Sequence, residues 1–126
     1  MLASWVQQTG FEPLTISVAV RKGRPIENLI DESKHFVLNQ VGTDATAMFR
    51  HFGKGFEPSQ DAFSGLTIRE TPSGIALADG IGVLSCRVSA RHDVGDHWLY
   101  IGQVIDGESD ESKQPYVHVR KNGLNY

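Results

Sequence analysis

Apolar and polar residues alternate along several short stretches of the chain, which is the pattern of strands with one buried face. The clearest case is 84–90, where an apolar residue occupies every second position. Over 97–106 both faces carry apolar residues, so we expect both to be covered. The pattern predicts strands over 14–20, 35–41, 66–70, 81–90, 97–106 and 116–120.

A period of three to four residues predicts two short helices. The first runs over 25–32 and begins with a proline, which is favoured at the first helical position. The second follows a cap at Thr43 or Asp44 and ends at Gly53, a common helix stop. Polar loops are expected over 53–64 and 107–114. Many short strands with two short helices predict a mainly β protein, built as a small β-barrel with helical decoration.

Composition narrows the class of protein. A chain of 126 residues suits one domain, and a net charge of −3 does not favour nucleic acid or an anionic membrane as a partner. No apolar run is long enough to span a bilayer. The single cysteine, Cys86, excludes an internal disulfide and suits a reducing compartment such as the cytoplasm. Because the chain begins abruptly with apolar residues, we expect a fragment of a longer protein.

A series of short motifs occurs in order along nearly the whole chain. They are Ala3-Ser4-Trp5, Phe36-Val37-Leu38-Asn39, Met48-Phe49-Arg50-His51-Phe52, Lys54-Gly55-Phe56, Cys86-Arg87-Val88, Gly95-Asp96-His97-Trp98, Gly102-Gln103-Val104 and 118–126. Together they resemble the flavin reductase family, and within it the C-terminal flavin reductase-like domain of cyanobacterial-type flavodiiron proteins (diflavin flavoproteins). The resemblance implies an FMN-binding split β-barrel over 1–126, with FAD as a possible substitute and NAD(P)H as hydride donor. It also implies a homodimer and further domains in a longer chain.

The resemblance also implies roles for individual residues. Ala3, Ser4 and Trp5 match the flavin loop. His97 matches a histidine near the flavin and the nicotinamide, where it would help to position the bound groups and would not have to transfer a proton. The implied cofactor-binding residues are Ala3, Ser4, Trp5, Thr9, Asn39, Lys54 and Phe56, and the implied catalytic residue is His97. Ser4, Thr9 and Lys54 would serve the phosphate, and Asn39 the flavin oxygens.

Each of these residues also has an ordinary structural interpretation. Trp5 can be a core side chain and Lys54 a solvated surface lysine. Asn39 can be a strand-end residue that faces water. His97 can be a turn histidine that is bonded to Asp96 or to the backbone.

Other chemistry in the sequence is less specific. The spacing of His92, Asp93, Asp96 and His97 matches no tight zinc pattern, and the di-iron centre of flavodiiron proteins belongs to a different domain. No Gly-x-Gly-x-x-Gly motif follows a strand, so the nicotinamide would have to stack on the flavin. The basic turn 21–24 could attract its phosphates or be an ordinary charged turn. Cys86 is expected to be packed and inert.

Two departures from the family pattern support a second hypothesis. A strand or two normally precede Ala3-Ser4-Trp5 in this family, and because the chain starts at Met1 we expect the barrel to lack them; few hydroxyl groups also occupy the flavin loop. The alternative is therefore a non-catalytic dimerisation or docking domain that keeps the split-barrel fold and binds flavin weakly or not at all. A third possibility is a stand-alone reductase that feeds a separate oxygenase or reduces ferric complexes.

Overall fold

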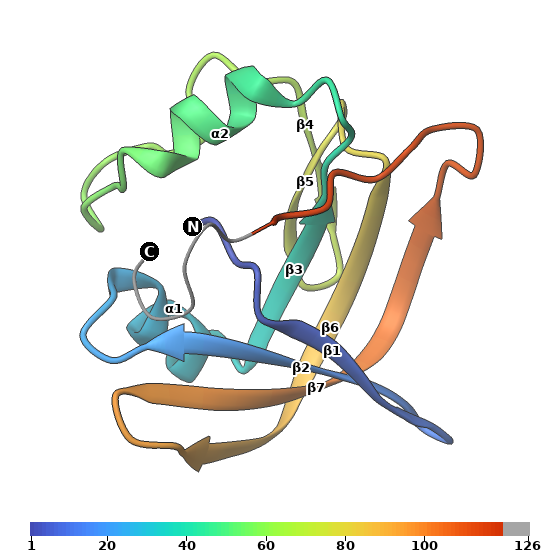
Figure 1. Ribbon diagram of the computed structural model, residues 1–126. Helices are drawn as coiled ribbons and strands as arrows, with labels where there is room; N and C mark the ends of the chain where they lie inside the picture. The colour runs from blue at the N-terminus through green and yellow to red at the C-terminus, as the bar shows by residue number, and fades with distance from the viewer. Residues whose placement is uncertain (120–126) are drawn as a thin grey trace.

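Five antiparallel strands form one strongly bent sheet in the order β1-β2-β7-β6-β3 (Figure 1). This computed structural model describes residues 1–119. The large sheet comprises β1 (Val6–Phe11), β2 (Leu14–Arg21), β3 (His35–Gln40), β6 (Gly82–Asp93) and β7 (His97–Ser109). A small hairpin of β4 (Ile68–Thr71) and β5 (Gly74–Leu77) and two helices, α1 (Pro25–Ser33) and α2 (Thr46–Gly53), complete the described part.

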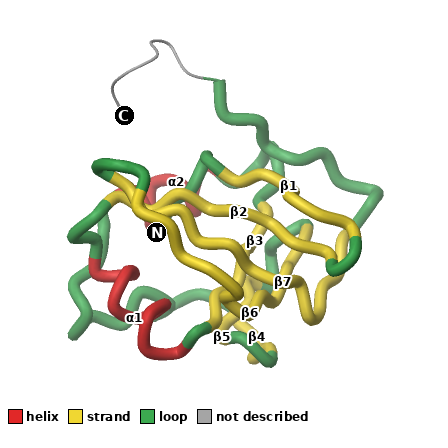
Figure 2. Tube along the Cα trace, turned by 90° about the horizontal axis from the view of Figure 1, so that it is seen from below, coloured by secondary structure: helices red, strands yellow, loops and turns green. Residues whose placement is uncertain are grey.

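The long β6–β7 hairpin turns the sheet on itself. Its pairing shifts register between Ser85 and Cys86 and again between Val88 and Ala90. Such bulges bend a strand and increase its twist, which lets the two ends of the hairpin join different halves of the sheet. The sheet is not closed, because β1 and β3 are its two edges and do not pair with each other. Figure 2, seen from below, shows β1 along the outer side of β2.

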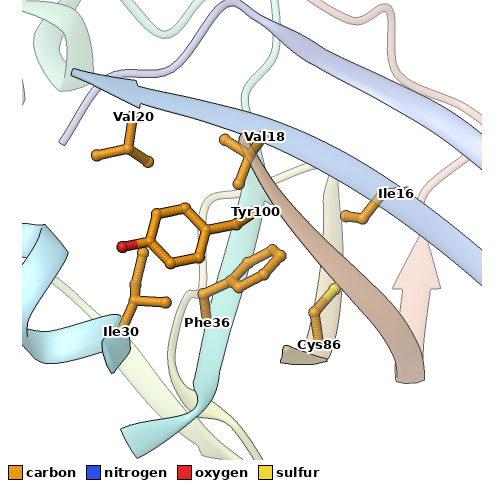
Figure 3. Close-up of a cluster of buried hydrophobic side chains, with 7 residues drawn as sticks. All are labelled: Ile16, Val18, Val20, Ile30, Phe36, Cys86 and Tyr100. Atoms are coloured by element: carbon orange, nitrogen blue, oxygen red, sulfur yellow. The ribbon is translucent and has the colours of Figure 1, made fainter. Parts of the chain in front are cut away.

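The core lies between the two halves of the bent sheet and α1. Its buried side chains are Ile16, Val18, Val20, Ile30, Phe36, Cys86 and Tyr100 (Figure 3). The Tyr100 ring lies between the β2 valines and the side chains of Ile30 and Phe36. Cys86 is fully buried, as the sequence predicts, and burial raises the pKa of its thiol to about 12.

The predicted helices form, but one cap is wrong. α1 starts at Pro25, and Lys34 follows it in the left-handed conformation with φ of 59°. The residue that caps α2 is Ala45, which makes no side-chain cap bond, and not Thr43 or Asp44. Those two residues lie in the preceding turn, where the Ala45 N–H donates to the Gly42 carbonyl at 3.1 Å. α2 has no fully buried residue.

Most predicted strands form, with corrected ends. The predicted alternation over 84–90 is wrong at Ser85, which is buried and lines a small cavity together with Arg69 and Thr71 of β4. The predicted loop over 107–114 begins only after Ser109, since β7 stays paired with β6 to that point. β1 and β5 were not predicted as strands, and β4 starts at Ile68 instead of position 66.

The predicted last strand over 116–120 is wrong for its described part. Residues 116–119 form no strand, and the side chains of Val117 and Val119 are 72% and 78% exposed. The adjoining Pro115 makes only an isolated bridge to Gly42. Residue 120 and the rest of the family-like motif over 120–126 lie outside the described residues. Neither helix of the described part is long and apolar enough to cross a membrane.

Candidate flavin site

The turn between β6 and β7 presents His97 together with its neighbour Asp96. The His97 ring is almost fully buried, and its Nδ1 lies 2.8 Å from the Asp96 carboxylate. The hydrogen bond from His97 lowers the pKa of Asp96 below its ordinary value. A carboxylate on Nδ1 fixes the proton of a neutral imidazole on that nitrogen. The contact to Asp96, which the sequence left open as the structural interpretation, is therefore present.

Trp5, near the start of the chain, packs against the His97 ring. The two ring centroids lie 4.9 Å apart at an interplanar angle of 46°. The Trp5 carbonyl accepts a hydrogen bond from the Ala19 N–H at 3.1 Å, which anchors it beside β2. Since the Trp5 side chain is still 42% exposed, it is not the core side chain of the ordinary interpretation. Two sequence-predicted site residues thus meet in space.

Residues 1–5 lead from this contact toward the end of α2 (Figure 1). A Cβ placed on Gly53 would lie 3.8 Å from a methyl of Leu2, so the segment reaches the last turn of that helix. Ala3 and Ser4 between them are exposed, and so is Lys54, which directly follows α2. The loop predicted to bind flavin therefore lies next to the last turn of α2, and the predicted phosphate lysine is the residue that directly follows that turn.

Two other predicted residues, Thr9 and Asn39, make contacts elsewhere. The Thr9 hydroxyl on β1 bonds the Thr15 hydroxyl at 3.0 Å. The Asn39 amide holds β5, donating to the Ile75 carbonyl at 3.3 Å and accepting the Leu77 N–H at 2.7 Å. The Asn39 amide is thus neither a strand end facing water nor placed beside His97.

Phe56 belongs to an aromatic cluster around α2. Its ring centroid lies 5.1 Å from that of His51 and 6.2 Å from that of Phe52. His51 also bonds the Ala62 carbonyl at 2.9 Å through Nε2. Phe63 completes the cluster at 6.0 Å from Phe52. The family-like motif around α2 therefore builds a local aromatic cluster in this chain.

One network of charged and aromatic side chains, which links the β6–β7 hairpin to α1, was not predicted from the sequence. The Arg91 guanidinium lies 3.6 Å from the centroid of the Trp98 ring and forms ion pairs with Glu27 and Asp31. The Trp98 indole N–H donates to Glu27 at 2.7 Å, and the Tyr100 hydroxyl donates to Asp31 at 3.1 Å. A sequence signal existed, because Glu27 and Asp31 are four residues apart on one helix face and Trp98 and Tyr100 share a strand face.

Metal chemistry finds no support in the described part of the chain. Among residues 1–119, no group of three or more His, Cys, Asp or Glu residues is arranged to hold a metal ion. Two small cavities in that range are lined by residues such as Gly82 and Glu108, away from Trp5 and His97. In the Trp5–His97 contact, the Trp5 side chain is the exposed member and the His97 ring the buried one.

The sequence matches the family described as "Flavin reductase like domain" over residues 1–123. The chain belongs to this family. It is 40% identical over its full length to the putative diflavin flavoprotein A 3 of Nostoc, and 37% identical to the diflavin flavoprotein A 1 of Synechocystis. It spans 22% of the length of each of these relatives.

Solved structures show the same fold. An NADH:FAD oxidoreductase of Streptomyces globisporus matches with a TM-score of 0.83 at 17% identity, covering 87% of this chain and 67% of that one. An FMN-binding protein of Thermus thermophilus matches with a TM-score of 0.75 at 16% identity, covering 87% and 63%. The predicted split β-barrel is therefore confirmed.

Proposed function

We propose that this domain binds FMN on the exposed surface of residues 1–5 and Lys54, beside the buried His97 ring, and that it takes hydride from NAD(P)H. The observation that carries the proposal is the contact between the Trp5 and His97 rings at 4.9 Å, which unites two residues implied by the family pattern. FAD is the alternative flavin. The flavin reductase-like family of the chain and its structural similarity to an NADH:FAD oxidoreductase support this assignment.

The chemistry of the exposed groups fits a flavin mononucleotide. The exposed part of Trp5 offers an aromatic wall for the ring, and stacking of this kind contributes about 1–3 kcal/mol for a nucleic-acid base. The Lys54 ammonium and the Ser4 hydroxyl offer a charge and a donor for the phosphate. Thr9 and Asn39 stay in the proposal as weaker contributors, because both side chains already have protein partners.

His97 acts in this proposal as a positioning group. A bound flavin supplies the hydride-accepting chemistry, and the protein orients it. Asp96 holds the His97 ring in one tautomer at 2.8 Å, so the imidazole presents a fixed pattern of donor and acceptor to whatever contacts it. Hydride transfer requires no general base on the protein, so this fixed orientation is the contribution we assign to His97.

The proposal is tested by flavin titration of the purified chain. We expect FMN to bind and NAD(P)H to bleach its absorbance. Trp5→Ala should weaken FMN binding by roughly tenfold, the equivalent of about 1.4 kcal/mol. Phe11→Ala is the matched control, since Phe11 is an 83% exposed aromatic residue at the end of β1. An absence of FMN and FAD binding at high micromolar concentration would reject the proposal.

Comparison with riboflavin isolates the phosphate contact. Lys54→Met should weaken binding of FMN and leave binding of riboflavin, which has no phosphate, unchanged. Lys113→Met serves as control, because Lys113 pairs with Asp110 in the segment after β7. Equal losses for both flavins would remove Lys54 from the phosphate site.

A dimerisation or docking domain is the second candidate function. The exposed edge strand β1 favours it, since the Val6, Phe11 and Leu14 side chains on the β1–β2 hairpin are 39%, 83% and 41% exposed. An unpaired edge strand with exposed apolar side chains at both of its ends is suited to a partner, including a second copy. A tight dimer that binds no flavin would favour this function, and a yellow protein that NADPH bleaches would reject it.

The length of the relatives leads to a proposal about the whole protein. Because the chain covers 22% of those diflavin flavoproteins, we propose that it works as one domain of a longer chain. Electrons from its flavin would pass to other domains and finally to oxygen. Oxygen consumption by the longer chain, lost on His97→Ala, would support this route.

A further inference from the structure

The turn that presents Asp96 and His97 is held at both of its ends by one lysine. The Lys22 backbone N–H donates to the Asp96 carbonyl at 3.0 Å. The Lys22 ammonium bonds the Asp93 carboxylate at 2.7 Å. Lys22 comes directly after β2, whose last residue, Arg21, is the cross-strand partner of His97. Both bonds therefore join the end of β2 to the turn.

Asp93 closes the same turn from within. The carboxylate oxygen that binds Lys22 also accepts the Gly95 N–H at 3.0 Å. Gly95 has φ of +91°, a backbone conformation that glycine adopts readily and other residues rarely. The bond from Lys22 is the main cause that lowers the pKa of Asp93, and the Gly95 bond adds to it. One oxygen atom thus couples the turn to β2.

The ammonium of Lys22 is itself oriented by the network behind the turn. It lies 4.3 Å from the centroid of the Trp98 ring, and the Arg91 guanidinium lies 3.6 Å from the same ring. The Lys22 side chain is 33% exposed, less than a freely solvated lysine. Cation–π contacts of this type contribute about 0.5–1 kcal/mol at exposed sites. Lys22 is therefore fixed by three contacts.

We propose that Lys22 and Asp93 are positioning residues that keep the Asp96–His97 pair in place. The hydrogen bonds of Lys22 and Asp93 within residues 1–119 are with the turn and not with the His97 ring. Both residues therefore act through the backbone of the turn. The role of the Asp96–His97 pair in turnover rests on the proposed function. The contacts that hold this pair in place do not depend on that function. Loss of the Lys22 ammonium frees the Asp93 end of the turn, so Asp96 should separate from His97 more often.

The first test needs no flavin. The carboxyl carbon of Asp96 is titrated by NMR in the unmodified protein, in Lys22→Met and in Asp93→Asn. His97 is the main cause of the lowered pKa of Asp96, and Arg21 is the neighbouring side-chain cation that adds to it. In both variants we expect that pKa to rise toward its usual ~3.9. Lys22→Arg should restore the low value, and Lys113→Met should leave it unchanged.

The second test measures turnover of the flavin-loaded chain with NAD(P)H. Lys22→Met should lower kcat several-fold with little change in flavin affinity, and Lys22→Arg should recover it. A folded Lys22→Met protein with an unchanged Asp96 titration overturns the inference. If the unmodified chain binds no flavin, the proposed function fails, and the NMR titration alone then decides whether Lys22 and Asp93 position the pair.

Discussion

Gly102 in β7 is the position where a single added methyl group should harm the fold most clearly. A Cβ built there would lie 2.5 Å and 2.8 Å from two ring carbons of Phe36 and 3.0 Å from the Cβ of Cys86. Carbon atoms pack at about 3.5–4.0 Å, so the Phe36 ring must move by roughly 1 Å. Both neighbours belong to the buried core, where such overpacking costs about 1–3 kcal/mol.

The effect of Gly102→Ala is measured by urea unfolding followed by circular dichroism. With a slope of about 1–3 kcal/mol per molar urea, the midpoint should fall by roughly 1 M. Gly53→Ala is the control and should not lower the midpoint. Its Cβ would meet a Leu2 methyl at an ordinary 3.8 Å, and alanine is more favourable than glycine in a helix by about 1 kcal/mol. The double variant with Phe36→Leu should lose less than the two single losses combined. An unchanged midpoint for Gly102→Ala would refute the packing argument.

Three further predictions concern buried polar groups. Burial, followed by the hydrogen bond to Asp31, raises the pKa of Tyr100 to about 12, so the stability it contributes is full below its usual ~10 and is lost as pH rises toward 12. Tyr100→Phe should therefore flatten the alkaline part of the urea-midpoint profile. The Cys86 thiol should not react with a thiol reagent at pH 8 until the protein unfolds, because it is buried and its pKa is about 12. Ser85→Ala should change the free energy of unfolding by less than about 1 kcal/mol, since its buried hydroxyl makes no hydrogen bond among the described residues; a urea midpoint lowered by 1 M would contradict this.

The sequence predicted strands where burial follows the residue pattern. β2, β3, β6 and β7 carry enough β-branched and aromatic residues on one face to be recognised locally. β1 was missed because Val6–Phe11 is largely exposed and pairs only with β2. Residues 116–119 show the opposite error, since they alternate like a strand but, within residues 1–119, make only the Tyr116 backbone bond to the Val41 carbonyl after β3 and form no ladder. Local pattern cannot report whether a partner strand exists.

The site divides in the same way. The bond between Asp96 and His97 is local, and the sequence included it among the structural interpretations. The contact of Trp5 with His97 joins two segments that are far apart in the sequence. Only the resemblance to the family therefore indicated that both residues belong to one site. The use of the Asn39 amide by β5 depends on a hairpin whose second strand was not predicted. Residue type alone could not show which partner the amide would take.

The candidate site has two parts: a firmly bonded turn that carries His97, and the exposed segment of residues 1–5. Asp96 contacts the histidine at 2.8 Å, Lys22 and Asp93 bond each other and the backbone of the turn at 2.7–3.0 Å, and Arg91 of the same hairpin pairs with Glu27 of α1. Among residues 1–119, the contact of the segment 1–5 with His97 is made by the Trp5 ring, and the residues of this segment are exposed. A flavin on the surface of residues 1–5 would therefore meet a lightly anchored loop, whose Trp5 packs on the prearranged, buried imidazole of His97. Because ordering such a loop costs free energy on binding, flavin affinity should depend more on residues 1–5 than on the His97 turn, while turnover should depend more on the turn.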